Sequence, residues 1–311
     1  MPIFLPALNL SRPLDNTAKT ENKLSLIRTK IKQAGETVLA GGLAGTSPLF
    51  LLSLLWRDCR NPFLLVVEEK ELEQKKEDVR TFSGKEPLLF SHDPSSSLPA
   101  LHTLLSPSRG WLMVTSSNSL SRPVIPAQEF KEHLFPLSPG LSVSYKHLLS
   151  FLSARGYNRT DTVREAGEYS VRGEIVDVWS VGYESPLRIV FHEEKIESLR
   201  FFNPFTQRSR AEKVHKFLIF PVHFKGPGNI QEYIPPDTIL FYHEELGGCV
   251  PPQYTKIEFS SFTRPDAVNF SVQTIPSFNG NFDLFWKGLS SWKEKGYIIR
   301  IFSHTETEKE R

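Results

Sequence analysis

A glycine-rich turn near the start of the chain has the layout of a phosphate-binding loop. ETVLAGGLAGTSPLFLL predicts a short strand, a tight turn and a helix that is apolar nearly all round. A working loop of this kind wraps phosphates with backbone N–H groups, neutralises them with a lysine and holds Mg²⁺ with a hydroxyl. With Gly42 as the first glycine of G-x-x-x-x-G-K-[ST], the last three positions are Ser47, Pro48 and Leu49. The second glycine, the lysine and the hydroxyl are therefore missing.

We expect this turn to keep a structural role and to bind no nucleotide or other cofactor. Pro48 cannot supply the positive charge, and it also removes a backbone N–H, although it suits an early helical position. The residues of the degenerate loop are Gly42, Gly45, Thr46, Ser47 and Pro48.

No other group of residues indicates an enzyme or a metal site. The chain has nine histidines, but none forms an H-x-x-x-H or H-E-x-x-H pair, and His243 with Cys249 comes nearest to a metal-binding spacing. Carboxylates such as Glu193 and Glu194 are adjacent, so on a strand they would point to opposite sides. There is no G-x-S-x-G for a nucleophile elbow. The sequence predicts no catalytic residue and no metal.

Two arginines lie in a stretch that predicts a β-hairpin. Apolar and polar residues alternate over residues 169–178 and again over 187–191, with a Gly/Ser/Pro break between them. One face would be buried. The other would face solvent and carry Arg172, Val176, Arg188 and His192. We expect Arg172 to lie about opposite His192 and Val176 about opposite Arg188, to within roughly two residues. Such a face could bind a partner, or its arginines could serve only as solvated surface charge.

The letters of this stretch add a family resemblance. GEYSVRGEIVDVW, LRIVFHEEKIESLRFFNP and TQRS resemble the UvrB-interaction module of the bacterial transcription-repair coupling factors (Mfd), and less closely that of UvrB. The resemblance implies that UvrA is the partner. By position, the UvrA-contacting arginines of the family correspond to Arg172 and Arg188, and a third contact position, aromatic in the family, is His192 here. Val176 completes the candidate partner-binding set.

The resemblance also implies a fold class and a division into domains. The fold would be α/β: a degenerate P-loop domain, RecA- or helicase-like, split by a small inserted α/β UvrA-interaction domain with a β-hairpin face. The expected division is an N-terminal arm (1–34), a first lobe (35–125), the UvrA-interaction domain (126–222) and a second lobe (223–311). Because HTETEKER resembles the start of a helix, we expect the second lobe to be truncated.

Three functions remain open from the sequence. The first is a non-catalytic adaptor that brings UvrA to stalled RNA polymerase. Contacts with the polymerase and DNA would then belong to parts of a longer relative. The second is a UvrB-like, nucleotide-dependent DNA helicase, which the missing lysine and the short, tyrosine-free connection SHDPSSSLPA disfavour. In the third, the UvrA-binding face docks onto its own chain, which is compatible with the first.

The remaining elements fit a parallel sheet. Strand and helix patterns alternate over residues 63–67, 71–82, 87–91, 97–105 and 111–116. Beyond residue 223 we expect a strand, a helix with Phe285 and Trp292 on its buried side, and a second strand.

Bulk composition favours a cytoplasmic protein without a membrane partner. The 311 residues include 37 basic and 35 acidic residues, so no global field attracts nucleic acid or a membrane surface. The two cysteines are far apart in sequence, which suits a reducing compartment. The longest apolar run, residues 49–56, is far shorter than the ~20 residues that span a bilayer.

Overall fold

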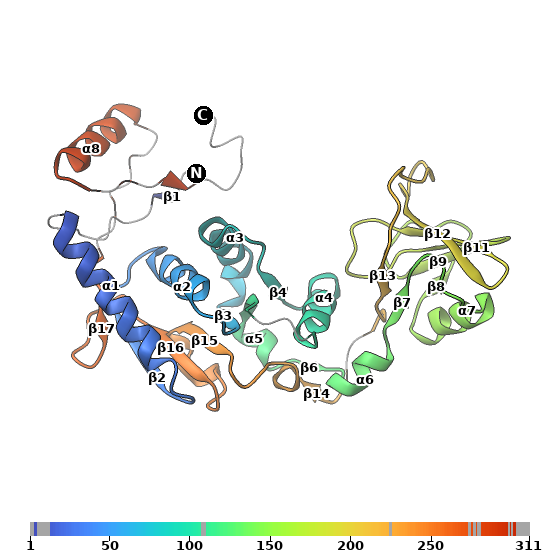
Figure 1. Ribbon diagram of the computed structural model, residues 1–311, viewed down its shortest axis with the longest axis horizontal. Coiled ribbons are helices and arrows are strands. Elements are labelled where there is room, and N and C mark those ends of the chain that lie inside the picture. Colours follow the sequence, from blue (N-terminus) through green and yellow to red (C-terminus); the bar gives the residue numbers. More distant parts are fainter. Residues whose placement is uncertain are drawn as a thin grey trace. The chain divides into compact units, whose positions relative to one another are not determined.

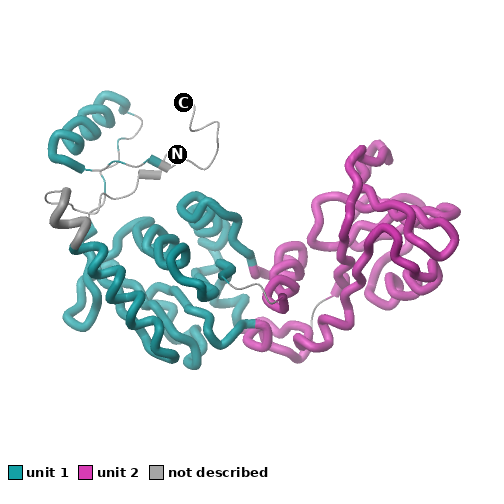
Figure 2. Tube along the Cα trace, viewed as in Figure 1, with its two compact units in different colours: residues 1–89, 108–120, 234–311 teal, residues 90–107, 121–233 magenta. Residues whose placement is uncertain are grey.

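The computed structural model describes residues 3–4, 13–106, 110–223, 226–272, 275, 278, 281–297, 299 and 301–302. The chain forms two compact units (Figure 2). Unit 1 comprises residues 1–89, 108–120 and 234–311, and unit 2 comprises residues 90–107 and 121–233. Unit 2 is thus built from two segments that interrupt the sequence of unit 1.

The described part of unit 1 is organised around a seven-stranded sheet in the order β17-β2-β16-β15-β3-β5-β4 (Figure 1). Strands β17 to β5 of this order pair in parallel. The bounds are β2 (Thr37–Gly41), β3 (Phe63–Val67), β4 (Leu88–Phe90), β5 (Leu112–Ser116), β15 (Ile239–His243), β16 (Thr255–Phe259) and β17 (Val268–Asn269). Because β15 pairs with β3, and β16 with β2, segments from both ends of the chain complete one sheet.

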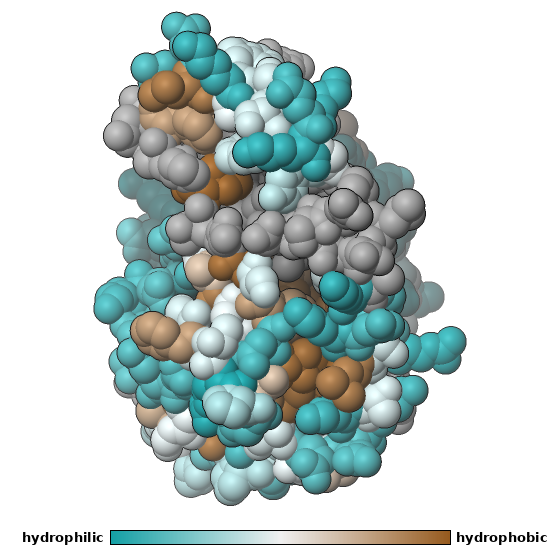
Figure 3. Space-filling view, turned by 90° about the vertical axis from the view of Figure 1, so that its left-hand side faces the viewer, coloured by the Kyte–Doolittle hydropathy of each residue, from teal (hydrophilic) through white to brown (hydrophobic). Residues whose placement is uncertain are grey.

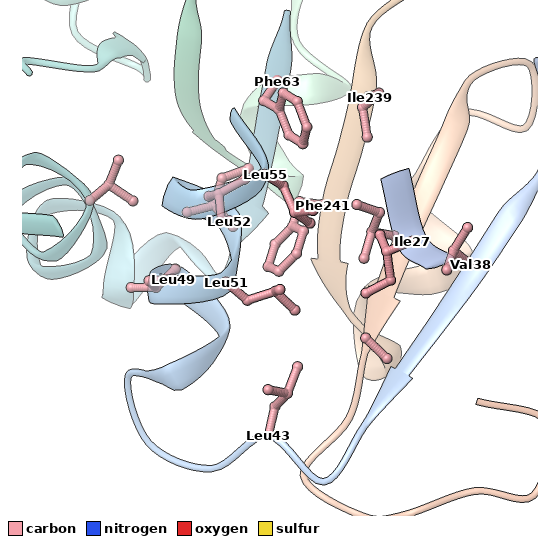
Figure 4. Close-up of a cluster of buried hydrophobic side chains, with 14 of the residues drawn as sticks. Ile27, Val38, Leu43, Leu49, Leu51, Leu52, Leu55, Phe63, Ile239 and Phe241 are labelled. Atoms are coloured by element: carbon pink, nitrogen blue, oxygen red, sulfur yellow. The ribbon is translucent and has the colours of Figure 1, made fainter. Parts of the chain in front are cut away.

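One face of this sheet is covered by helices whose apolar residues share its core. They are α1 (Pro13–Lys30), α2 (Ser47–Asp58) and α3 (Leu72–Ser83). Figure 4 shows Ile27 of α1 and Leu55 of α2 close to Phe241 of β15. Within the segment expected as an arm, Leu24 and Ile31 are also buried in this core. All five residues of β3 are buried, as a central parallel strand requires.

Shorter elements complete unit 1. They are α5 (Ser117–Leu120), α8 (Phe282–Glu294), the 3₁₀ helices η1 (Glu69–Glu71) and η3 (Glu244–Cys249), and the antiparallel pair β1 (Ile3–Phe4) and β18 (Ile301–Phe302). In α8, Phe285 and Trp292 are half-buried and both contact the ring of Phe278. Two other side chains of α8, Phe282 and Trp286, are exposed. Figure 3 shows this side of unit 1, where groups of hydrophobic residues are exposed on a largely hydrophilic surface. HTETEKER lies outside the described residues.

The described part of unit 2 contains a five-stranded sheet in the order β12-β11-β10-β9-β8 and two short antiparallel pairs, β13–β7 and β14–β6. The sheet strands are β8 (Asn158–Arg159), β9 (Glu168–Arg172), β10 (Ile175–Val178), β11 (Leu187–His192) and β12 (Lys195–Phe201). The short pairs use β6 (Pro123–Val124), β7 (Phe135–Leu137), β13 (Phe217–Ile219) and β14 (Gly228–Asn229). The helices are α4 (Pro94–Leu104), α6 (Ala127–Glu132), α7 (Tyr145–Ala154) and the 3₁₀ helix η2 (Ile230–Glu232).

The prediction of a single strand over residues 169–178 is wrong. A turn at Gly173, which has a φ of 60°, separates β9 from β10, and Arg172 pairs directly with Ile175. Since paired residues share a face, the two turn residues reverse the alternation expected for β10. Val176, expected in solvent, is therefore fully buried in the core cluster that includes Leu148 and Leu152 of α7, whereas Ile175 lies on the opposite face.

Among the described residues, no helix is long and apolar enough to span a membrane.

Candidate partner-binding site

The five-stranded sheet has one face on the core with α7 and a second face that carries the charged residues. We call the second face the outer face. Its members follow from the strand register and are Ser170, Arg172, Ile175, Asp177, Arg188, Val190, Ser198 and Arg200, with His192 at the end of β11. Arg172, Arg188 and His192 therefore lie on one face, as predicted from the alternation within each strand.

Arg188 is held at the centre of the outer face by a two-point ion pair. Its Nε and Nη2 donate to Oδ1 and Oδ2 of Asp177, both at 2.8 Å. The Asp177 side chain is only 2% exposed, and that of Arg188 is 18% exposed. The hydrogen bonds that Arg188 donates to Asp177 raise the pKa of the Arg188 guanidinium, in spite of burial. Arg188 is thus an internal ion-pair partner, and the expectation that it faces solvent freely is wrong.

The same guanidinium also holds the segment that follows β12. Nη1 of Arg188 donates to the Gln207 carbonyl at 3.1 Å and to the Ser209 hydroxyl at 3.2 Å. Its guanidinium carbon lies 4.7 Å from the ring centroid of Phe202, which is fully buried. Residues 202–209 therefore form a second layer over part of the outer face.

Arg172 is exposed, and its guanidinium is oriented by its own chain. Nη2 donates to the Asp161 carbonyl at 2.8 Å and to the Thr162 hydroxyl at 3.1 Å. The neighbouring carbonyl, that of Val163, accepts a 3.5 Å hydrogen bond from the Gln207 side chain. Segment 161–163 thus connects Arg172 with the layer that Arg188 holds in place.

Comparison with known proteins identifies this region. Residues 135–224 match the model of the UvrB interaction domain. They contain β7, α7, the five-stranded sheet and β13, and so the whole outer face.

The chain is also similar to curated transcription-repair-coupling factors. It is 30% identical to that of Escherichia coli (strain K12) over 206 residues, which is 61% of this chain and 18% of the relative. With the protein of Borreliella burgdorferi it shares 23% identity over 229 residues, 69% of this chain and 20% of the relative. That of Bacillus subtilis (strain 168) is 26% identical over 186 residues, 55% of this chain and 16% of the relative. The chain contains a UvrB interaction domain and is homologous to the transcription-repair coupling factors. It spans a fifth or less of the length of these relatives.

The predicted residues of the UvrB interaction domain are not equally accessible. Arg172 and His192 are exposed, Arg188 is half-buried, and Val176 is inaccessible in the core. His192 ends β11 at a tight turn in which Glu193 has a φ of 54°. The outer face consequently offers Arg172 and His192 directly, with the half-buried Ile175 and Val190 paired between β10 and β11.

Two features of this domain are missing from the sequence prediction. One is Asp177, whose role could have been inferred from a lone carboxylate in the apolar strand IVDV. The other is the exposure of Phe205, which is 92% exposed in the turn around Pro204.

In unit 1, the degenerate loop uses its backbone groups internally. Gly42 N donates to the Phe262 carbonyl at 2.9 Å, and Leu43 N donates to the Ser260 carbonyl at 3.1 Å. A Cβ on Gly42 would lie 2.0 Å from the Phe270 carbonyl oxygen, so a neighbouring segment fills the space on that side of the turn. Helix α2 follows directly, with Thr46 as N-cap and Pro48 in its first turn.

A cavity of about 260 Å³ lies beside this loop, next to the carboxyl ends of β3 and β15. Its lysines are paired with carboxylates, Lys70 with Glu68 at 2.6 Å and Lys75 with Glu71 at 3.7 Å, and His243 Nδ1 lies 3.6 Å from a Glu245 carboxylate oxygen. The hydrogen bond from Lys70 lowers the pKa of Glu68. Phosphates entering here would meet three carboxylates and cations that already have partners. Among the described residues, no group of three or more His, Cys, Asp or Glu side chains could hold a metal ion.

Proposed function

We propose that this chain is a non-catalytic adaptor that binds UvrA through the outer face of its UvrB interaction domain. The observation that carries the proposal is Arg172, an exposed guanidinium oriented by two hydrogen bonds within the domain that the family model matches. A planar guanidinium can engage a carboxylate at two points, and a pre-oriented one loses little conformational entropy on binding. Arg172 and His192 would contact UvrA, and Arg188 would hold the surface in shape.

The homology supports a role in transcription-coupled repair. In this proposal the adaptor recruits nucleotide excision repair to stalled RNA polymerase, in the cytoplasm. Contacts with the polymerase and with DNA would be made by parts present in the longer relatives, since the chain spans 18% of the E. coli protein.

Unit 1 would then be a degenerate P-loop domain, of the RecA or helicase type, that carries the inserted module. The missing lysine, the N–H groups of Gly42 and Leu43 that bond within the chain and the self-paired charges of the cavity all favour a non-catalytic role over a UvrB-like helicase.

The test is UvrA binding by the Arg172→Ala variant, measured by calorimetry with purified UvrA. Loss of a central interface arginine weakens binding by about 2 kcal/mol, or roughly 30-fold in Kd. The matched control is Arg57→Ala, because the Arg57 side chain is 71% exposed and lies in unit 1. Equal affinities for wild type and Arg172→Ala would rule out the proposed contact.

A further inference from the structure

The turn that follows β12 presents a single aromatic side chain to solvent. Phe205 is 92% exposed, the highest value among the large apolar side chains of the described residues. A lone exposed apolar residue is common and by itself indicates nothing. The construction of the turn beneath it carries the inference.

Several hydrogen bonds within the chain hold this turn. The Asn203 carboxamide oxygen accepts from the backbone N–H groups of Phe205 and Thr206, both at 2.9 Å. Gln207 N donates to the Asn203 carbonyl at 2.8 Å, with Gln207 in the left-handed region at a φ of 59°. The Gln207 side chain donates to the Pro204 carbonyl at 2.7 Å. The backbone at Phe205 is thus fixed before any partner arrives.

This turn is also tied to the proposed binding face. Arg188 donates to the Gln207 carbonyl while it holds Asp177, and the Gln207 side chain reaches Val163 beside the residues that orient Arg172. The ion pair at the centre of the outer face therefore positions both the turn and, through segment 161–163, the exposed arginine.

We propose that Phe205 is an anchor of the docking surface that inserts into an apolar pocket on UvrA. This rests on the proposed function, because it names a second contact on the same partner. A rigid aromatic side chain that covers nothing in its own chain gains its full apolar burial on binding and loses little entropy, as is typical of interface hot spots. The exposed Arg208 and Arg210 follow Phe205 closely in the sequence, so the pocket should have a carboxylate-rich rim.

The test compares Phe205→Ala with Arg172→Ala in calorimetric titrations with purified UvrA. Phe205→Ala should weaken binding by at least about tenfold and leave the melting temperature unchanged, since the side chain is almost fully exposed. The matched control is Phe262→Ala, a 76% exposed phenylalanine in unit 1, which should bind as wild type.

Salt separates the two contacts. Between about 0.1 and 0.5 M salt, the affinity ratio of wild type to Arg172→Ala should shrink, whereas the ratio of wild type to Phe205→Ala should stay constant, because apolar burial is not screened. A second pair tests the turn. Asn203→Ala removes the oxygen that accepts from the turn and should weaken UvrA binding, whereas Asn203→Asp keeps this oxygen and should bind like the wild type.

The outcomes are distinguishable. Normal binding by Phe205→Ala together with loss of binding by Arg172→Ala overturns the anchor and leaves the proposed function intact. Failure of the wild-type chain to bind UvrA overturns both.

Discussion

Substitution of Arg188 by alanine should destabilise unit 2 strongly. The change leaves the Asp177 carboxylate, 2% exposed, without the guanidinium that contacts both of its oxygens at 2.8 Å. Removing one partner of a buried ion pair costs about 3–5 kcal/mol, because the other charge remains buried without compensation. The contacts of Arg188 with Gln207, Ser209 and the Phe202 ring are lost as well. We therefore expect a loss of at least about 3 kcal/mol in the free energy of unfolding.

Urea unfolding of the full chain measures this loss. Trp179 lies in unit 2, where its indole donates to the Tyr183 carbonyl, so tryptophan fluorescence includes a signal from that unit. The control is Arg200→Ala. Arg200 is the cross-strand neighbour of Arg188 and donates to the backbone carbonyls of Arg210 and Ala211 rather than to a carboxylate. Its removal should cost only about 0.5–1.5 kcal/mol.

A double variant tests the reason for the loss. Arg188→Met combined with Asp177→Leu leaves no buried charge and should recover most of the stability. If Arg188→Ala unfolds at the wild-type urea midpoint, the ion pair does not order the outer face and the account of this surface is wrong.

Three further predictions concern other parts of the chain. Calorimetry with Mg-ATP should give no saturable binding at micromolar concentrations, since the degenerate loop lacks the lysine; a stoichiometric isotherm would contradict this. Gly42→Ala should lower the free energy of unfolding by at least about 1–3 kcal/mol, because residue 42 has a φ of 69° and its added Cβ would clash with the Phe270 carbonyl. Gly45→Ala adds backbone strain alone and should cost less. A lower urea midpoint for Gly45→Ala than for Gly42→Ala would disprove the packing argument. Burial against Phe220 lowers the pKa of His102, so the stability that neutral His102 contributes is present above about pH 6.5 and is lost as the pH falls. On acidification, the melting temperature of His102→Gln should therefore drop less than that of the wild type. Equal drops would refute this role of His102.

Local patterns predicted the strands and the longer helices between residues 63 and 116. The apolar run FLLVV became the fully buried β3, and the helix and strand patterns that follow it became α3, β4, α4 and β5. Strand β16 (Thr255–Phe259) was not predicted. Its sequence TKIEF has polar residues at alternate positions, which is atypical of a central parallel strand. Its place between β2 and β15 depends on pairing with segments far away in sequence.

In unit 2 the predicted faces of the strand over residues 169–178 failed at one turn. VRGEIV alternates well enough to suggest an unbroken strand, but Gly173 allows a two-residue turn that reverses the faces of the residues after it. Val176 was therefore placed in solvent. Arg188 and His192 were placed correctly because β11 is a continuous strand. The burial of Arg188 depends on its pairing with a carboxylate of the neighbouring strand, which the pattern of β11 alone does not reveal.

The measurement that tests the central claim most directly is hydrogen–deuterium exchange of the full chain with and without purified UvrA. The account predicts that UvrA protects peptides covering residues 168–178, 187–192 and 203–208, which carry the outer face and its turn, and leaves the degenerate loop at residues 41–49 unchanged. Protection confined to unit 1, or no protection in either unit at saturating UvrA, would contradict it.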